Sequence, residues 1–176
     1  MNSIYRNARF IISVMNMAQL PENSQSEVVF AGCSNAGKSS LINTLTDQHK
    51  LARVSKTPGR TQSLNFFQIA DSRYVVDLPG YGYFSVSGKT QAKWKALLET
   101  YFHEREVLKG LVIVMDVRHP LKQYDKNMLA WSADNNLPSH IVLTKGDKLK
   151  RGPAKNTVFK VQAWLKEQGY TATVQL

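Results

Sequence analysis

Short apolar stretches alternate with longer amphipathic ones along most of the chain. The short stretches lie at 27–31, 64–70, 74–77, 111–116, 140–143 and 171–176. They predict strands, and the uninterrupted apolar run at 111–115 is typical of a parallel strand covered on both faces. Residues 39–45, 88–109, 121–135 and 156–168 predict helices. Strands that alternate with helices predict an α/β fold whose mostly parallel sheet binds its ligand at the carboxyl ends of the strands.

The organisation of the chain predicts one domain, because 176 residues suffice for one sizeable core. A polar turn at 71–73 joins the strands at 64–70 and 74–77, which predicts one antiparallel hairpin. Residues 1–26 are interpreted as a preamble that packs an apolar patch at 10–14 on the domain. Residues 48–62 lack apolar periodicity and carry Lys50, Arg53, Lys56 and Arg60, which predicts a basic loop.

The charge of the chain changes this picture. Lys and Arg number 23 against 13 Asp and Glu, which gives a net charge of +10 and a pI near 9.8. This excess indicates a polyanionic partner beyond one nucleotide, with RNA first, an acidic membrane surface second, and a merely cationic surface left open. Cys33 is the only cysteine, so an intramolecular disulfide and a CxxC metal site are excluded. No stretch has the length of a membrane span, and we expect a cytoplasmic monomer.

The candidate chemistry begins where the first long apolar strand ends. There the sequence fits the phosphate-binding pattern G-x-x-x-x-G-K-[ST] over Gly32, Cys33, Ser34, Asn35, Ala36, Gly37, Lys38 and Ser39. The glycines let backbone N–H groups surround an anion, and the following helix adds its positive end. Lys38 is expected to neutralise the outer phosphates, and the Ser39 hydroxyl is expected to ligate Mg²⁺.

Two further strand ends carry motifs in the order found in GTPases. Asp77, Leu78, Pro79 and Gly80 fit D-x-x-G, a weak pattern alone, in which the carboxylate holds the Mg²⁺ shell and the glycine N–H reaches the γ-phosphate. Thr144, Lys145, Gly146 and Asp147 fit [NT]-K-x-D. A carboxylate there accepts two N–H donors from guanine and rejects adenine, while the lysine stem covers the base. Together the motifs predict a P-loop NTPase three-layer sandwich, a Ras-like G domain that binds GTP or GDP with Mg²⁺.

Several blocks give the chain a family resemblance over nearly its whole length. They are the 32–40 loop, Lys56–Gln62, Asp77–Tyr83, Asp116–Leu121 and Thr144–Asp147. With these blocks the chain resembles the EngB (YihA) family of bacterial Era-like GTPases. The resemblance implies slow GTP hydrolysis, a role in assembly of the large ribosomal subunit with its precursor or rRNA as partner, and a role in normal cell division and septation.

The resemblance also implies roles for individual residues. Ser39 and Thr61 would ligate Mg²⁺, and Lys38, Thr61 and Gly80 would be catalytic. The effector switch would comprise Gly59, Arg60, Thr61, Gln62 and Ser63. Asn35 matches the asparagine that coordinates K⁺ in some relatives, so K⁺ is a further candidate cofactor.

Two features of the chain depart from the pattern of this family, and a third departs from that of Ras-like proteins. Cys33 stands where this family commonly has arginine, and Tyr81 follows Gly80 where Ras-like proteins have the glutamine that orients water. Unassisted hydrolysis is therefore expected to be slow. The family continues past the last predicted strand with a Ser-rich guanine loop and a helix. We therefore expect these 176 residues to be a truncated form.

Other interpretations remain open at this point. A P-loop kinase or ATPase is a second class, against which the motif at 144–147 argues. An RNA-binding module with a structural nucleotide site is a third, against which the Mg²⁺ ligands argue. Asp116, Arg118 and His119 either hold a loop at a strand end or contact a partner.

Overall fold

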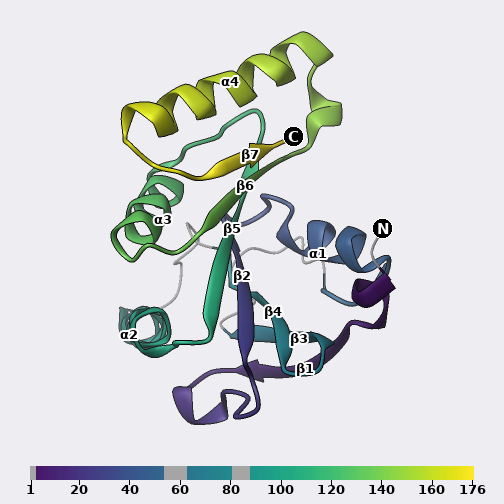
Figure 1. Cartoon of the computed structure of the whole chain (residues 1–176), viewed down its shortest axis with the longest axis vertical. Coiled ribbons are helices and arrows are strands. Elements are labelled where there is room, and N and C mark those ends of the chain that lie inside the picture. The colour runs from purple at the N-terminus through teal and green to yellow at the C-terminus, as the bar shows by residue number, and fades with distance from the viewer. Residues whose placement is uncertain (1–2, 54–62, 81–87) are drawn as a thin grey trace.

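The computed structural model describes residues 3–53, 63–80 and 88–176, and its centre is a seven-stranded sheet (Figure 1). The strand order is β1-β3-β4-β2-β5-β6-β7. The strands are β1 (Arg9–Val14), β2 (Ser26–Gly32), β3 (Leu64–Ala70), β4 (Arg73–Asp77), β5 (Leu108–Asp116), β6 (Ser139–Thr144) and β7 (Thr173–Gln175). Within this described sheet only β3 runs opposite to the other strands, since it pairs antiparallel with both β1 and β4. The predicted mostly parallel α/β sheet is confirmed.

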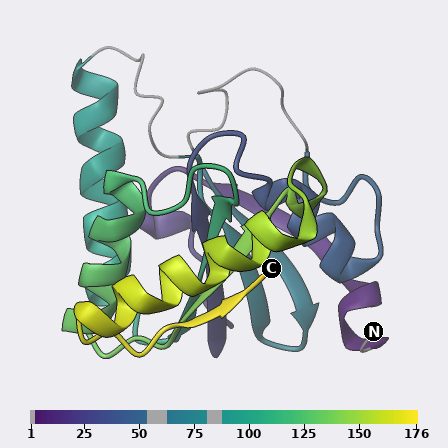
Figure 2. The same cartoon turned by 90° about the horizontal axis from the view of Figure 1, so that it is seen from above.

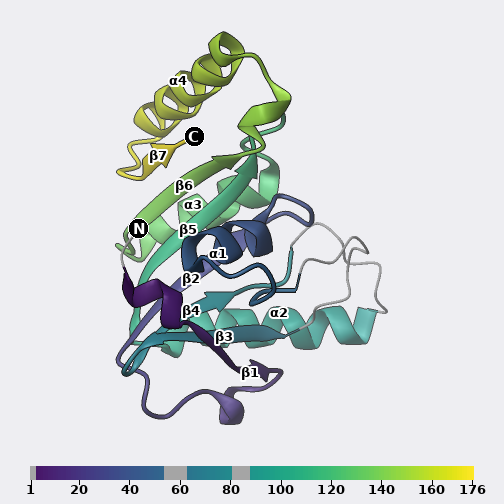
Figure 3. The same cartoon turned by 90° about the vertical axis from the view of Figure 1, so that its right-hand side faces the viewer.

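Helices cover both faces of the sheet (Figures 1 and 3). They are α1 (Lys38–Thr46), α2 (Gly88–Glu104), α3 (Gln123–Asp134) and α4 (Arg151–Glu167), with short 3₁₀ helices η1 (Ser3–Asn7), η2 (Met17–Gln19) and η3 (Gly146–Lys148). The core of one face joins Leu97 of α2, Leu129 of α3 and Val161 of α4. The core of the other face contains Ile42 of α1. The molecule therefore has three layers.

The central strands serve both cores because successive side chains of a strand point to opposite faces. In β5, Leu111, Ile113 and Met115 belong to the larger core, whereas Val114 belongs to the core under α1. All four are buried. This arrangement explains why the 111–115 run has no polar residue.

The parallel register brings the candidate motifs to one edge of the sheet. Phe30 pairs with Asp77, Gly32 with Val114, and Asp116 with Thr144. Since these strands are parallel, the segments that follow β2, β4, β5 and β6 all leave the sheet at the same edge. The fold thereby brings together motifs that are more than 100 residues apart in sequence.

Two elements differ from the sequence interpretation. The helix predicted at 156–168 begins at Arg151, five residues earlier than the sequence indicated. Pro153 is compatible with the first turn of this helix, because the N–H it lacks would have no partner within the helix. The segment taken as a preamble contributes β1, an edge strand paired with β3.

A buried ion pair fixes α2 at the opposite end of β2. Glu27 is fully buried and accepts hydrogen bonds from Tyr101 Oη (2.6 Å) and Arg105 Nη2 (2.6 Å). Arg105 also donates to the Pro21 carbonyl (2.9 Å). Burial, with the Glu27 charge, raises the pKa of Tyr101 well above its usual value. This cluster joins the start of β2 to the end of α2.

Candidate nucleotide site

The phosphate-binding loop at 32–39, the P-loop, turns sharply between β2 and α1. Gly37 is the N-cap of α1 and has φ +103°, a conformation that side chains disfavour. Gly80 approaches the same loop so closely that an added Cβ would lie 2.6 Å from Ser34 Cα. Glycine at position 80 therefore lets the D-x-x-G segment lie directly against the P-loop.

Lys38 and Asp77 provide opposite charges beside this loop, and both are buried. Lys38 Nζ donates to the Gly32 carbonyl (3.0 Å). Burial lowers the pKa of Lys38 and raises the pKa of Asp77 to about 6, although each charge partly offsets the effect on the other. Among the described residues, no hydrogen-bond donor reaches Asp77 Oδ1.

These residues fit a hard divalent cation. Ser39 and Asp77, whose Oδ1 has no donor among the described residues, line the same cavity of about 590 Å³. Oxygen ligands and few protein contacts are what Mg²⁺ prefers when phosphates and water complete its shell. We call this the phosphate cavity, and its size suits a small-molecule ligand.

The phosphate cavity also has walls from segments that sequence reasoning did not assign to it. Ser13 of β1 and Asn65 of β3 line it, and Ser13 Oγ donates to Asn65 Oδ1 (2.7 Å). Ser63, assigned to the effector switch, lines it as well. The aromatic and β-branched residues at 10–14 were the available signal that a strand lies there. Thr61 and the other switch residues 59–62 lie outside the described residues, as does Tyr81.

The loop after β6 is tied to the P-loop. The Thr144 hydroxyl contacts the Ala36 carbonyl and lies 3.1 Å from the Met115 carbonyl. Lys145 has φ +61° and donates from Nζ to the Asn35 carbonyl (2.6 Å). These contacts hold residues 144–147, the candidate base loop, in a fixed position relative to the candidate phosphate site.

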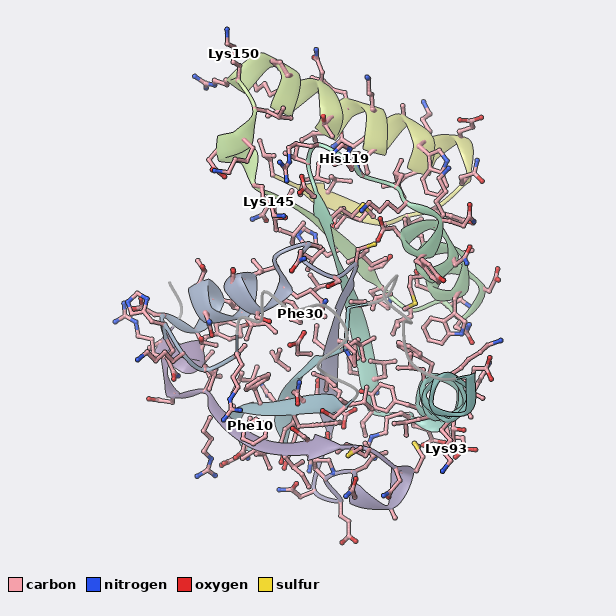
Figure 4. All side chains as sticks on the ribbon, turned by 180° about the vertical axis from the view of Figure 1, so that it is seen from behind. Phe10, Phe30, Lys93, His119, Lys145 and Lys150 are labelled. Carbon is pink, nitrogen blue, oxygen red and sulfur yellow. The ribbon has the colours of Figure 1, made fainter. Side chains whose placement is uncertain are left out.

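The end of β5 supports the same lysine. Asp116 Oδ2 lies 3.0 Å from Lys145 Nζ and accepts Arg118 Nη2 (2.6 Å). Asp116 Oδ1 accepts the backbone N–H (3.0 Å) and Nε (2.9 Å) of Arg118. These donors, led by Arg118, hold the pKa of Asp116 far below its usual value, against the effect of burial. Asp116 thus holds its own loop and also contacts Lys145, which Figure 4 labels.

Asp147 is the exposed member of the base loop. Its side chain is 68% exposed and pairs with Lys148 (2.8 Å). Hydrogen bonding from Lys148 lowers the pKa of Asp147, so the carboxylate is charged at neutral pH. An exposed carboxylate can exchange the Lys148 contact for ligand N–H donors with little desolvation cost.

Cys33 points away from the phosphate cavity. Its Sγ lies 4.0 Å from Asp125 Oδ1, and it lines a second cavity of about 230 Å³ that Arg118, His119 and Lys122 also line. Burial, reinforced by the Asp125 charge, raises the pKa of the thiol. Ser34 and Asn35 of the same loop line both cavities, and Ala36 lines the second.

Comparison with known proteins gives concordant matches. The family model described as "50S ribosome-binding GTPase" matches residues 27–145. "Probable GTP-binding protein EngB" of Xanthomonas campestris pv. campestris is 54% identical over 176 residues, which covers 99% of this chain and 85% of that protein. The protein of the same name in Xylella fastidiosa is 54% identical over 162 residues, which covers 92% and 80%.

Solved structures match in fold. The crystal structure of a probable GTP-binding protein EngB matches with a TM-score of 0.61 at 22% identity, over 78% of this chain and 79% of that chain. The G domain of the T. maritima FeoB iron transporter matches with a TM-score of 0.52 at 23% identity, over 85% and 84%. The predicted Ras-like G-domain architecture is thereby confirmed.

Proposed function

The chain belongs to the EngB family of GTP-binding proteins and is a GTPase, and from this premise we propose that it is a Mg²⁺-dependent switch acting on a precursor of the large ribosomal subunit. The observation that carries the nucleotide assignment is the tie between two loops: Lys145 and Thr144 hold the base loop against the Asn35 and Ala36 carbonyls of the P-loop. A site joined in this way holds base and phosphates at a fixed separation, as recognition of a complete nucleotide requires.

Each residue of the candidate nucleotide site has a defined role in this proposal. The backbone N–H groups of 34–38 and the start of α1 bind the phosphates. Lys38 supplies a positive charge. Because the residue is buried, water screens the attraction between this charge and the phosphates only weakly. Ser39 and Asp77 would hold Mg²⁺, which supplies charge neutralisation at the transferred phosphoryl group when bound. Gly80 donates its N–H to the terminal phosphate, and Asp147 accepts from the guanine edge.

Hydrolysis is expected to be slow in the isolated protein. The family resemblance gives Thr61 a part in Mg²⁺ binding and in the switch, and Gly59–Ser63 the effector role. We further propose that K⁺, bound with help from Asn35, stimulates turnover in place of an arginine finger. Equal rates in K⁺ and Na⁺ would remove Asn35 from that role.

The partner is proposed from the family description and the charge. A 50S ribosome-binding GTPase model matches the central segment, and the net charge of +10 suits a polyanion such as rRNA. We propose that the protein works in the cytoplasm as a monomer, and that it has a role in normal cell division and septation, as the family resemblance implies. Among the described residues, no helix has the length and apolarity needed to cross a bilayer.

Two measurements test the proposal. Calorimetric titration with GDP and ADP, with and without Mg²⁺, should show binding of GDP alone, and Lys38→Ala should abolish it. Co-sedimentation with large ribosomal subunits should differ between GDP and a non-hydrolysable GTP analogue. Equal affinity for ADP would favour an ATPase or kinase. Subunit binding that is equally strong with GDP and with the GTP analogue would favour an RNA-binding module with a structural nucleotide site.

A further inference from the structure

The helix α4 and the segment before it carry an unusual run of positive charge. Residues 148–166 contain six Lys and Arg and no Asp or Glu. All six side chains are exposed. Figures 1 and 3 show α4 along one edge of the molecule, beyond β6 and β7, and in Figure 2, which is seen from above, α4 lies in front of the sheet. Four of these six cations lie on α4 itself, which also contains Glu167, and Lys148 and Lys150 lie just before it. This segment therefore contributes a substantial part of the net charge of +10.

Helical spacing arranges part of this charge in a line. Five exposed residues of α4 follow one another at intervals of four, four, three and four positions: Arg151, Lys155, Phe159, Gln162 and Lys166. Side chains at such intervals lie on one side of a helix. The line spans about 22 Å at the rise of about 1.5 Å per residue. We call these five residues the α4 strip.

The buried side of α4 lies away from this strip. Ala154, Val161 and Leu165 are buried, and the latter two belong to the larger core. The helix is thus anchored by one side and presents the strip to solvent. A partner can contact the strip without displacing the core.

The charges of the strip are not neutralised within the described chain. Elsewhere Arg6 pairs with Asp47, Lys95 with Glu99, and Arg118 with Asp116. Arg151, Lys155 and Lys166 form no ion pair with any described residue. Three unpaired cations in a line favour a ligand that is itself a line of negative charges.

Phe159 adds a second property to the strip. Its side chain is 62% exposed, and it lies one turn after Lys155. Exposed aromatic rings among basic residues stack on unpaired bases and are common where proteins bind RNA. A membrane-surface helix would instead present a broad apolar face, and Phe159 is the only apolar aromatic side chain in the strip.

We propose that the α4 strip is a docking surface for structured RNA, in which Arg151, Lys155 and Lys166 contact backbone phosphates and Phe159 stacks on an unpaired base. This inference rests on the proposed ribosomal partner and identifies the surface that binds it. The strip lines neither described cavity, so RNA and nucleotide have separate sites.

The test compares variants with equal loss of charge. The strip variant carries Arg151→Gln, Lys155→Gln and Lys166→Gln. Its control carries Lys93→Gln, Lys95→Gln and Lys109→Gln, three exposed positions away from α4; Figure 4 shows Lys93 far from Lys150. A third variant carries Phe159→Ala alone. The probes are large ribosomal subunits, protein-free large-subunit rRNA, and phosphatidylserine vesicles, each titrated at several KCl concentrations.

The strip variant should bind subunits and rRNA more weakly than its control, and the slope of log affinity against log salt should fall by about 2 to 3, since each lost phosphate contact removes about 0.7 to 0.9. Phe159→Ala should weaken binding about ten-fold with the slope unchanged. GTP turnover without RNA and the melting temperature should match wild type in every variant.

Three outcomes would overturn the inference or its premise. If wild type binds subunits and the strip variant binds as its control does, the strip is not the RNA surface, while the proposed function stands. If the strip variant loses only vesicle binding, the occupant is a membrane. If wild-type protein binds neither subunits nor rRNA, the ribosomal partner itself is wrong.

Discussion

Replacement of Asp116 by asparagine should loosen the base loop without disturbing the fold. The side chain of Asp116 is 12% exposed and contacts both Lys145 Nζ and the guanidinium of Arg118. Asparagine has nearly the same shape but no charge. If its carbonyl oxygen keeps the Oδ1 bonds to Arg118, its NH₂ group replaces Oδ2 and faces Lys145 Nζ and Arg118 Nη2. Lys145 would keep only its bond to the Asn35 carbonyl.

The size of the effect follows from that geometry. A hydrogen bond to a charged group contributes about 1.5 to 3 kcal/mol. Because Lys145 is 31% exposed and retains one partner, we expect the lower end, about 1.5 kcal/mol, or roughly a ten-fold loss of GDP affinity. The pKa of Asp116 is held far below its usual value. The ionised Asp116 carboxylate therefore stabilises the folded protein at every pH above its unfolded-state pKa of about 4. This stabilisation is lost as the pH falls from there through the lower folded-state pKa.

The assay is dissociation of a fluorescent GDP analogue, measured for Asp116→Asn, Lys145→Met and the double variant. If Asp116 acts through Lys145, the double variant should release GDP no faster than Lys145→Met alone. Arg118→Gln is the control for loop support, and it should have a smaller effect. The reasoning would be refuted if Asp116→Asn released GDP at the wild-type rate, or if the effects of the two substitutions were strictly additive in the double variant.

Three further predictions concern separate parts of the molecule. Arg105→Met should destabilise the protein by about 3 to 5 kcal/mol, because Glu27 would stay buried without its cation, and thermal melting should fall by about 10 °C; an unchanged melting point would contradict the role of the pair. Asp147→Asn should weaken GDP binding and favour xanthosine diphosphate, and unaltered GDP affinity would remove Asp147 from base reading. Since burial raises the pKa of Asp77 to about 6, Mg²⁺ should bind the nucleotide complex more weakly as pH falls below about 6, and titration at pH 5 and 7.5 checks this. The same raised pKa makes Asp77 a cost to stability as pH rises from about 4 to 6 in the nucleotide-free protein.

Much of the fold was predictable because its signals are local. The run at 111–115 contains only apolar residues because both faces of β5 are covered, and that rule needs no knowledge of distant contacts. The strand ends with motifs at 32–39, 77–80 and 144–147 came to one edge because parallel register requires it. The start of α4 was predicted five residues late, since Gly152 and Pro153 resemble a loop in sequence but are compatible with a first helical turn.

The remaining features depend on contacts between distant segments. Nothing near Arg9–Val14 indicates that this segment pairs with β3 or that Ser13 lines the phosphate cavity. The link between Asp116 and Lys145 joins two strand ends, and spacing alone left Asp116 open between loop support and a partner contact. The pairing of Glu27 with Arg105 spans the chain from β2 to the end of α2. Such contacts follow from packing, which no single stretch of sequence specifies.

Turnover of GTP by the purified chain, with and without large ribosomal subunits, tests the central claim most directly. Phosphate release should require Mg²⁺, be slow in isolation at roughly 10⁻⁴ s⁻¹, and increase when subunits are added. Lys38→Ala should abolish it under both conditions. ATP turned over as fast as GTP, or turnover that persists in Lys38→Ala, would contradict the assignment of the site, and an unchanged rate with subunits would contradict the ribosomal switch.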